Sequence, residues 1–219
     1  MGFSDEWDSQ YATIAHLSIS DLVSYVMRYA RPTGPDFRVL ELGPGAGANI
    51  PFFKHLTADY HAIDGSPTIV AALRTIFPEF SRNILAADFT SAINFDTPFD
   101  LIVDRAAITH NDTAAISKTL QMCLNILKPE GKFIGIDWFS TEHSDYRLGE
   151  EAGDYYTRRN IEEGQFHGIG NVHFSDREHL IKLFSGFRFE KLEHKIHKRE
   201  VPQDNHVFAS YNIIAVKAL

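Results

Sequence analysis

The segment 37–47, FRVLELGPGAG, joins a short apolar run to a turn that contains three glycines. Residues 37–42 have the apolar composition of a buried strand. The glycines allow the backbone to turn tightly and to approach a ligand closely. A helix is expected after the turn, through about residue 57, and its first turn offers N–H groups to an anionic or polar ligand. The segment therefore predicts a strand, a ligand-binding turn and a helix.

Short apolar runs alternate with helical patterns on both sides of this turn, which is the signature of βαβ units and a mostly parallel sheet. Strands are expected at residues 37–42, 60–63, 83–86, 99–103, 132–137, 187–192 and 207–216. Further helices are expected at residues 3–16, 20–31, 66–76, 112–127 and 175–184. Pro129 and Gly131 are expected to close the helix at 112–127, and Ser175 to cap the start of the last helix. Such a sheet binds ligands at the carboxyl ends of its strands.

The glycine turn alone fits both the GxGxG pattern of methyltransferases and the GxGxxA pattern of dinucleotide-binding proteins. The acidic residues and the segment that accompany this turn distinguish between the two patterns. Glu41 lies just before the first glycine, Asp64 ends the second expected strand, and Asp88 follows the third. The segment LKPEGKFIGID at 127–137 leads into the fifth strand. In order and spacing these features resemble the class I S-adenosylmethionine-dependent methyltransferase family over about residues 36–138, and loosely to the end of the chain.

The resemblance implies that the cofactor is S-adenosylmethionine and the product S-adenosylhomocysteine. It implies that Glu41 organises the amino end of the cofactor, that Asp64 accepts both ribose hydroxyls, and that Asp88 meets the adenine amino group. The expected cofactor-binding residues are Glu41, Gly43, Gly45, Gly47, Asp64, Gly65, Asp88, Phe89, Asp104 and Tyr11. It also implies an α/β, Rossmann-like fold: a seven-stranded, mostly parallel sheet in the order 3-2-1-4-5-7-6, with the last strand antiparallel and helices on both faces.

Methyl transfer is an in-line displacement on a carbon that the sulfonium already activates, so catalysis is mostly alignment. A general base is needed only where the acceptor holds a proton tightly, and no metal ligand is assigned. The segment 104–111, after the fourth strand, resembles a motif of many bacterial small-molecule methyltransferases. Asp104 and His110 could orient or deprotonate an acceptor there, and Arg105 could hold an anionic group. Alternatively, Arg105 pairs with Asp104, and His110 caps the following helix.

The segment 138–174 has no regular pattern and is the expected substrate cap. His143, which follows the fifth strand, is the second candidate base because imidazole accepts protons near neutral pH; the alternative is a loop histidine in solvent. The strip at 164–170 is rich in glycine and either folds over a substrate or is a flexible connection. The candidate substrate contacts are Arg105, His110, His143, His167 and Tyr155.

Residues 1–34 are expected to form a helical lid. Trp7 and Tyr11 lie four apart on its first helix, and aromatic faces suit a sulfonium cation. An aromatic pair at this spacing also occurs in ordinary helix packing. Tyr11 is therefore either part of a lid over the cofactor or a packing residue.

Composition limits the class of partner. The net charge of −8 argues against a general nucleic-acid binder. The single cysteine, Cys123, excludes an intramolecular disulfide framework and any site built from several thiolates. Residues 1–16 lack the pattern of a signal peptide, and no apolar run reaches the length of a membrane span. We expect one cytoplasmic domain over residues 1–219, without a membrane partner, as a monomer or homodimer.

The sequence therefore predicts an enzyme that methylates oxygen or nitrogen of a small molecule. Two other functions stay open. The first is a methyltransferase that acts on protein or RNA, against which the acidic charge argues. The second is a non-catalytic subunit that binds S-adenosylmethionine, against which the intact glycine turn and its acidic companions argue.

Overall fold

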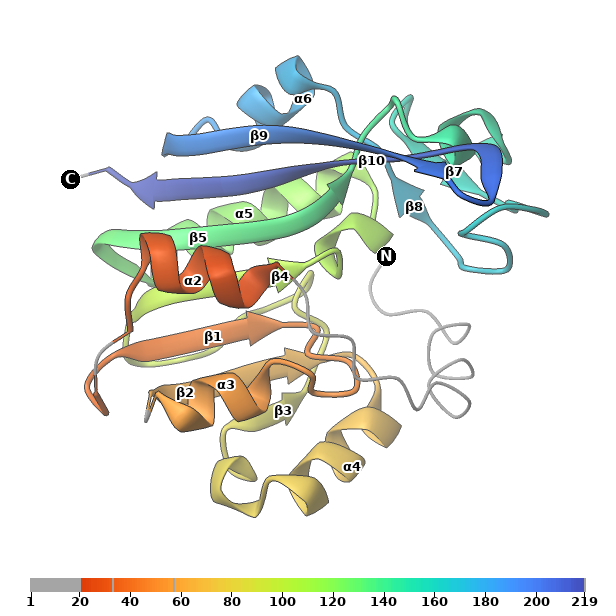
Figure 1. Ribbon diagram of the computed structural model, residues 1–219. Coiled ribbons are helices and arrows are strands. Elements are labelled where there is room, and N and C mark those ends of the chain that lie inside the picture. Colours follow the sequence, from red (N-terminus) through yellow and green to blue (C-terminus); the bar gives the residue numbers. More distant parts are fainter. Residues whose placement is uncertain (1–20, 33, 57, 219) are drawn as a thin grey trace.

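The computed structural model describes residues 21–32, 34–56 and 58–218, and strands alternate with helices along most of this chain (Figure 1). The helices are α2 (Leu22–Tyr29), α3 (Ile50–His55), α4 (Pro67–Ile76), α5 (Thr113–Ile126) and α6 (Arg177–Leu183), with the short 3-10 turns η1 (Pro78–Phe80), η2 (Ile108–His110) and η3 (Ser144–Arg147). The strands are β1 (Arg38–Leu42), β2 (Asp59–Asp64), β3 (Ile84–Ala86), β4 (Phe99–Arg105), β5 (Leu127–Phe139), β6 (Glu150–Glu151), β7 (Thr157–Arg159), β8 (Val172–His173), β9 (Phe187–Glu200) and β10 (Gln203–Lys217). The helix expected at 3–16 lies outside the described residues.

The main sheet has seven strands in the order β3-β2-β1-β4-β5-β10-β9. Neighbouring strands from β3 to β5 are parallel, and β10 runs antiparallel to both of its neighbours, β5 and β9. Counted within this sheet, the order is 3-2-1-4-5-7-6 with the last strand reversed. The expected fold is therefore confirmed.

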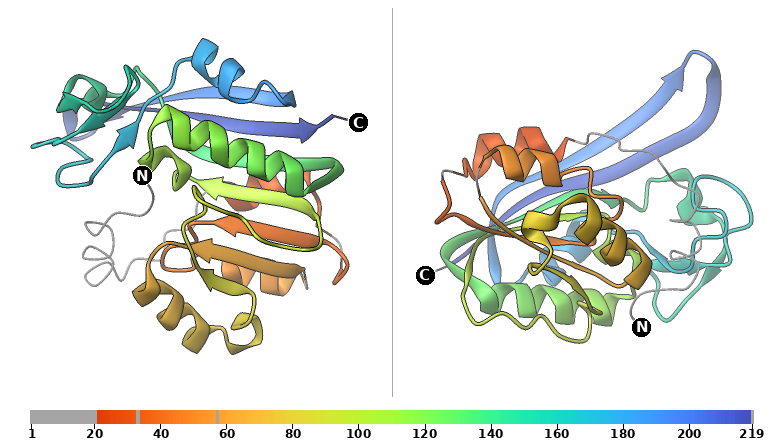
Figure 2. Two further views of the ribbon diagram at one scale, coloured as in Figure 1. Left: turned by 180° about the vertical axis from the view of Figure 1, so that it is seen from behind. Right: turned by 90° about the horizontal axis from the view of Figure 1, so that it is seen from below.

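Helices cover both faces of the sheet (Figure 2). α2, α3 and α4 contribute Leu22, Phe53 and Leu73 to a hydrophobic cluster on one face. α5 and α6 contribute Ile116 and Leu180 to the cluster on the other face. With both faces buried, the central strands contain short apolar runs such as Leu101, Ile102 and Val103 in β4, all fully buried.

Two expected helix boundaries are wrong. α6 is capped by Asp176 rather than Ser175, because the Asp176 side chain accepts a hydrogen bond from the His179 N–H. After α5, Gly131 does not close the helix in a left-handed turn. The residue with positive φ there is Glu130, at 60°, and extended backbone from Leu127 onward already counts as β5.

The segment 138–174 is more regular than its sequence suggests. Its three short strands form a second, antiparallel sheet in the order β6-β7-β8. Phe139, Ile161, Phe166, Val172 and Phe174 form a small hydrophobic core of its own. Figure 1 shows this region beside the carboxyl ends of the parallel strands, and we refer to residues 138–174 as the cap.

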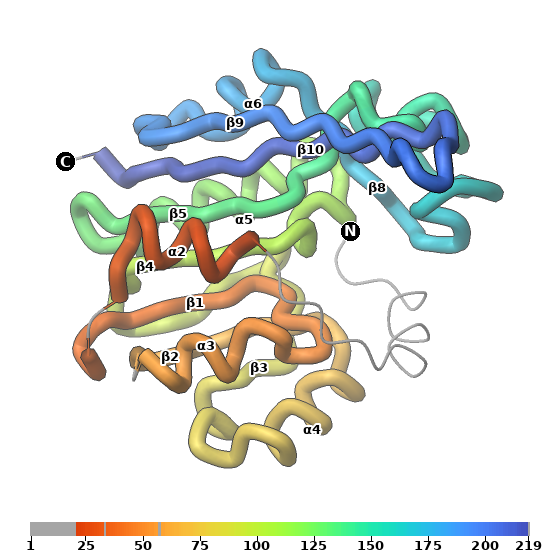
Figure 3. The backbone as a smooth tube through the Cα atoms, viewed as in Figure 1, coloured from red at the N-terminus to blue at the C-terminus, as the bar shows by residue number. Residues whose placement is uncertain are grey.

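The closing strands are longer than expected. Strands were expected at 187–192 and 207–216, but β9 and β10 form a hairpin that reaches from the main sheet to the cap (Figure 3). Lys195, Lys198 and Arg199 lie on this hairpin, on the edge strand β9, where lysines discourage the addition of another strand. The outer half of β9 is exposed, so it lacks the apolar alternation by which strands are recognised.

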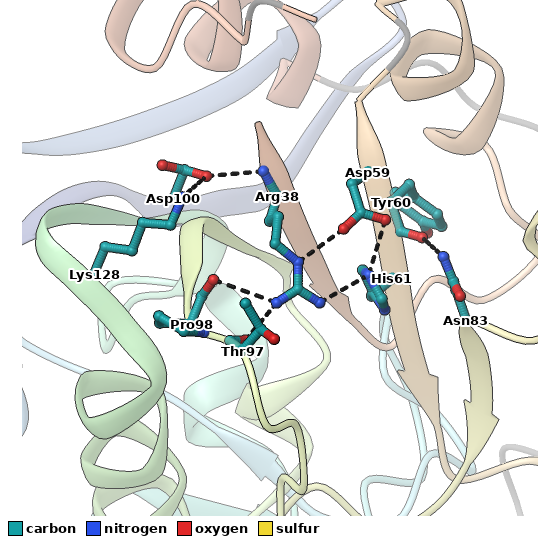
Figure 4. A network of polar contacts seen from close by, with 9 residues as sticks. All are labelled: Arg38, Asp59, Tyr60, His61, Asn83, Thr97, Pro98, Asp100 and Lys128. Carbon is teal, nitrogen blue, oxygen red and sulfur yellow. Dashed lines mark hydrogen bonds and ion pairs between the residues drawn. The ribbon is translucent and has the colours of Figure 1, made fainter. Parts of the chain in front are cut away.

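The amino ends of the strands are held together by Arg38 (Figure 4). Its Nε lies 2.8 Å from Asp59 Oδ2 on β2, and its Nη1 donates to the Thr97 carbonyl at 2.6 Å. The Arg38 N–H donates to Asp100 on β4 at 2.8 Å, and Asp100 also pairs with Lys128 on β5 at 2.7 Å. These contacts join four strands at the edge opposite the cap. No helix of the described ranges is long and apolar enough to cross a membrane.

Candidate active site

A cavity of about 290 Å³ lies where the carboxyl ends of β1, β2, β3 and β4 meet the cap. Residues from the main sheet and its loops line one part: Gly43, Asp64, Gly65, Ala87, Asp88, Phe89, Arg105, Ala106, Ala107, His110 and Asn111. Residues of the cap line the rest and are called the cap wall: Phe139, Gln165, Phe166, Ile169 and Asn171. The cavity is therefore at the edge of the sheet that the topology predicts.

The glycine turn brings backbone to the cavity. Gly43, Gly45 and Gly47 all have positive φ, at 63°, 52° and 81°, which is the region that glycine adopts without strain. A Cβ at Gly43 would lie 2.3 Å from the Cβ of Ala107, and a Cβ at Gly47 would lie 2.6 Å from Leu73 Cδ2. Both positions therefore exclude any larger residue. Of the three expected glycines, Gly43 itself lines the cavity.

Asp64 lines the cavity and also fixes the glycine turn. Its Oδ2 accepts a hydrogen bond from the Gly45 N–H at 3.2 Å, and its Oδ1 accepts one from the Ser66 N–H at 2.9 Å. The side chain is 2% exposed. Asp64 therefore has two roles at once: it orders the turn from β2 and presents a carboxylate to the cavity.

Asp88 is the second carboxylate at this end of the cavity. Its Oδ1 accepts from the N–H and the hydroxyl of Thr90, at 2.8 and 2.7 Å, and its Oδ2 accepts from the Ser91 hydroxyl at 2.8 Å. Burial raises the pKa of Asp88, but these hydrogen bonds outweigh it, and the pKa lies below its usual value. Asp88 is thus an ionised acceptor at neutral pH. Gly65 and Phe89 also line the cavity, as expected.

Glu41 does not line the cavity. Its carboxylate is buried and accepts hydrogen bonds from Asn49 Nδ2 at 2.8 Å and the Tyr60 hydroxyl at 2.6 Å. Burial raises the pKa of Glu41, against the lowering effect of these two bonds. In this structure Glu41 braces the segment behind the glycine turn, between β1, β2 and the start of α3.

Asp104 is fully buried and likewise absent from the cavity lining. Its Oδ1 accepts from the N–H groups of Ala107 and Ile108, at 3.1 and 3.0 Å, and its Oδ2 accepts from Trp138 Nε1 at 2.7 Å. Burial raises the pKa of Asp104 to about 7. Asp104 therefore shapes the loop that carries Ala106, Ala107 and His110, from beneath the cavity.

Arg105 lines the cavity but does not use Asp104 as its partner. Its Nε lies 3.5 Å from Asp137 Oδ2, and the other oxygen of Asp137 lies 3.4 Å from Lys195 Nζ. The proposed pair with Asp104 is therefore wrong, because Asp104 points into the core. Among the described residues that line the cavity, Arg105 is the only Lys or Arg.

His110 also lines the cavity, at the end of η2. Its Nδ1 lies 3.1 Å from the Asn171 carbonyl oxygen. Because a carbonyl only accepts, Nδ1 carries the proton and Nε2 carries the lone pair of the neutral ring. Burial lowers the pKa of His110 to about 4. His110 does not cap α5; Asp112 does, because its side chain accepts from the Ala115 N–H at 2.8 Å.

His143 is not at the cavity. Its side chain is completely buried, among the rings of Phe139, Phe166, Phe174 and Phe208. Its Nδ1 accepts from the Asp145 N–H at 3.1 Å. The expectation that it faces a substrate fails because β5 runs on to Phe139 and the next loop turns under the β9–β10 hairpin, which places Phe139 and Phe166 in the cavity lining and His143 outside it.

Two other expected substrate contacts lie away from the cavity, and one cofactor contact lies outside the described residues. Tyr155 is 60% exposed and packs against the rings of Tyr146 and Tyr156. His167 is exposed, although its neighbour Phe166 is buried in the cap wall. Tyr11, with the rest of the expected lid up to residue 20, lies outside the described residues.

Asn111 and the polar residues of the cap wall line the cavity but are not among the residues predicted from the sequence. Asn111 is 4% exposed and donates to the Ile108 carbonyl at 3.2 Å. Gln165 and Asn171 come from a segment in which only the density of glycine gave a signal. An amide side chain has no motif spacing of its own, so only the folded cap identifies these residues.

The comparisons with known proteins agree with this geometry. Residues 39–131 match a family model described as a methyltransferase domain. None of the curated proteins matches the chain in sequence. Among solved structures, the chain is similar to an S-adenosylmethionine-dependent methyltransferase from Methanosarcina mazei, with 16% identity over 87% of this chain and 96% of the other and a TM-score of 0.68.

Two further structures share the fold. An S-adenosylmethionine-dependent methyltransferase from Clostridium acetobutylicum is 13% identical over 98% of this chain and 99% of its own, with a TM-score of 0.67. The 1,6-didemethyltoxoflavin N1-methyltransferase of Burkholderia thailandensis, solved with 1,6-didemethyltoxoflavin and S-adenosylhomocysteine bound, is 17% identical over 96% of this chain and 81% of its own, with a TM-score of 0.63.

Proposed function

We propose that this chain, whose residues 39–131 match a methyltransferase domain, is a class I S-adenosylmethionine-dependent methyltransferase. We further propose that it methylates an oxygen or nitrogen of a small molecule held against the cap wall. The observation that carries the proposal is the division of the cavity. One end has the glycine turn and two carboxylates, and the other has amides and aromatic rings. The first end suits the cofactor and the second suits a compact acceptor with a polar edge.

S-adenosylmethionine is the cofactor, and the residues at the carboxylate end fit it. Asp64 lines the cavity beside the glycine turn that it orders, and a carboxylate suits the ribose hydroxyls because it accepts hydrogen bonds from more than one direction. Asp88 is ionised and suits the adenine amino group, and Phe89 offers a ring beside it. Gly43 lines the cavity at a position where packing against Ala107 leaves no space for a side chain, so its backbone is available to the cofactor. When bound, the cofactor supplies a methyl carbon activated by the sulfonium.

The cap supports a small acceptor rather than a protein or RNA. Phe139, Phe166 and Ile169 close the cavity from the side of the cap, and an extended polymer would need an open groove there. Gln165 and Asn171 add amide side chains that can donate to or accept from a polar edge. The net charge of −8 also disfavours a polyanion. The setting that we propose is a cytoplasmic enzyme whose partner is a metabolite.

His110 is the general base that we propose for acceptors that lose a proton. Its bond to the Asn171 carbonyl fixes the tautomer and leaves the basic lone pair on Nε2. With a pKa of about 4, the ring is neutral over the physiological range. A weak base is sufficient for an acceptor hydroxyl, because its proton becomes strongly acidic as the oxygen forms its new bond to carbon. Arg105 would orient an anionic part of the acceptor.

The test is a transfer assay with S-adenosylmethionine labelled in its methyl group, the full-length protein, and pooled small molecules from a bacterial extract. Label is expected in at least one small product, and His110→Ala and Arg105→Ala should each reduce it at least tenfold. Tyr155→Ala, which changes an exposed ring away from the cavity, should leave the rate unchanged.

The same assay is run with the protein and RNA fractions of the extract as acceptors. Label confined to either polymer would overturn the small-molecule proposal while leaving the methyltransferase assignment intact. Binding of S-adenosylhomocysteine without transfer to any fraction would favour the non-catalytic subunit.

A further inference from the structure

A second group of chemically versatile side chains lies behind the cap wall and has no part in the proposed reaction. It consists of His143 and Asp145, from the loop that contains η3, and His206, near the start of β10. One ligand atom from each residue lies within 4.8 Å of the others. We refer to these three residues as the His-Asp-His cluster.

The distances in the cluster match those between ligands of one tetrahedral ion. Zinc binds nitrogen and oxygen at about 2.0–2.1 Å, so two ligands of a tetrahedral zinc lie roughly 3.4 Å apart. Asp145 Oδ1 lies 3.1 Å from His206 Nε2 and 3.7 Å from His143 Nδ1. The two imidazole centroids are 5.1 Å apart, and rings that share a tetrahedral zinc are separated by about 5 Å.

The cluster is built into the fold rather than spread over a surface. The side chains of His143 and Asp145 are completely buried, and that of His206 is 35% exposed. The Phe166 N–H donates to Asp145 Oδ2 at 3.0 Å, which leaves Oδ1 directed at the histidines. The Val207 N–H donates to the Ser144 hydroxyl at 2.8 Å and holds the loop against β10. A carboxylate buried in this way needs a positive partner.

We propose that His143, Asp145 and His206 bind a divalent transition-metal ion of the zinc type. Two imidazoles and one carboxylate are ligands that zinc commonly takes, with water in the fourth position, and the exposed side of His206 leaves room for that water. Magnesium and calcium prefer oxygen ligands and are disfavoured. The ion takes the place of the proton that His206 and Asp145 otherwise share, and His143 gives its Nδ1 to the ion in exchange for the bond from the Asp145 N–H.

The position of the ion gives it a structural role. His143 and Asp145 belong to the cap, and His206 belongs to the β9–β10 hairpin of the main sheet (Figure 3). An ion bound to all three cross-links these two parts of the molecule. Asp145 also holds the backbone of Phe166, a residue of the cap wall. The ion therefore fixes the wall against which the acceptor lies, without touching the acceptor.

The test uses the full-length protein after treatment with a chelator, titrated with Zn²⁺ or Co²⁺ by calorimetry. One ion per chain is expected, with release of protons and a rise in melting temperature that grows with metal concentration. Co²⁺ should give the intense visible absorption of a four-coordinate ion. Mg²⁺ at the same concentration should produce none of these effects.

His206→Ala is the decisive variant, since its side chain is partly exposed and its loss does not disturb a core. It should weaken Zn²⁺ binding at least tenfold and abolish the cobalt absorption, and His206→Gln should behave in the same way. His197→Ala, an exposed histidine of the same hairpin, is the matched control and should bind the ion as the wild type does. An unchanged affinity in both His206 variants, or no binding by the wild type, would show that hydrogen bonds alone hold the cluster.

Discussion

In the proposed mechanism, His110 is the residue that removes the proton from the acceptor. His110→Ala should lower kcat by about 10²–10⁴-fold if the ring acts as general base, with the dissociation constant of S-adenosylhomocysteine unchanged. The pH profile is a sharper measure. Because burial holds the pKa of His110 near 4, kcat/KM should stay level through neutral pH and fall only near pH 4. A decline centred at about 6.5, the value of an ordinary histidine, would assign the base to another residue.

At Gly43, the addition of a single methyl group should weaken cofactor binding more than the backbone strain alone would. In Gly43→Ala the new Cβ would meet Ala107 at 2.3 Å with φ at 63°, so the turn must shift at a cost of about 1–3 kcal/mol. Calorimetry with S-adenosylhomocysteine should show an affinity at least tenfold weaker. Gly168→Ala is the control, because its φ of 70° brings similar strain but nothing lies within 4 Å of the new Cβ. Equal affinities in the two variants would contradict the close approach inferred at Gly43.

At the scale of elements, Asp154 joins the cap to α5, the helix that follows the loop carrying His110. Its Oδ2 accepts from the Thr113 N–H at 2.8 Å in the first turn of α5, while its Oδ1 accepts from the Tyr156 N–H at 2.8 Å in the cap. Asp154→Ala should therefore loosen the cap wall. We expect a several-fold rise in KM for the acceptor, with cofactor affinity unchanged. Glu151→Ala, exposed on the same small sheet, should change neither value, and a loss of cofactor affinity in Asp154→Ala would refute the separation of the two ends.

The elements of the main sheet could be predicted because local pattern and burial agree there. Strands buried on both faces appear in the sequence as apolar runs. Asp64 and Asp88 each follow such a run, so their position at the carboxyl edge of the sheet could be predicted. The full length of the hairpin has no clear signal in the sequence, because the outer half of β9 is exposed and Ile196 is its only apolar residue. An exposed strand of this kind forms because it pairs with β10, and this pairing cannot be predicted from the local sequence.

The cap shows why part of the candidate site could not be predicted. His143 follows a strand just as His110 does, yet its loop turns under the hairpin and the side chain is buried in the core of the cap. Whether a loop residue faces a cavity depends on contacts between distant segments, here Ser144 with Val207. Gln165 and Asn171 reach the cavity for the same reason. Spacing along the chain does not determine such contacts.

For the whole molecule, buried histidines make the free energy of unfolding depend on pH. Burial lowers the pKa of His110 and His143 to about 4 and that of His173 to about 3. The unfolded chain takes up these protons at about pH 6.5, whereas the folded chain does not. The stability is therefore fully present above about pH 6.5 and is lost as pH falls toward 4, by about 1.4 kcal/mol per pH unit for each histidine.

Asp104 has the opposite effect on the pH dependence of stability. Burial raises its pKa to about 7, so its ionisation costs stability as pH rises from about 4 toward 7 and offsets one of the three histidines. Urea unfolding at a series of pH values should still show a midpoint that falls between pH 6.5 and 4. His110→Gln should flatten this dependence, and His167→Ala, which removes an exposed histidine, should not. A midpoint independent of pH over this range would contradict the burial of these rings.

The hydrogen bond from Trp138 Nε1 to Asp104 also equips the molecule with an optical reporter. Indole emission responds to the charge and polarity beside the ring, and Asp104 is tied to the N–H groups of Ala107 and Ile108 just beneath the cavity. The chain has two tryptophans and eight tyrosines, so Trp7→Phe leaves Trp138 as the only indole, which can be excited at the red edge of its band, where tyrosine does not absorb. Its emission should change on titration with S-adenosylhomocysteine, and the double variant Trp7→Phe, Trp138→Phe should lack this indole emission. Occupancy of the site can then be followed by light, in real time and without a labelled ligand.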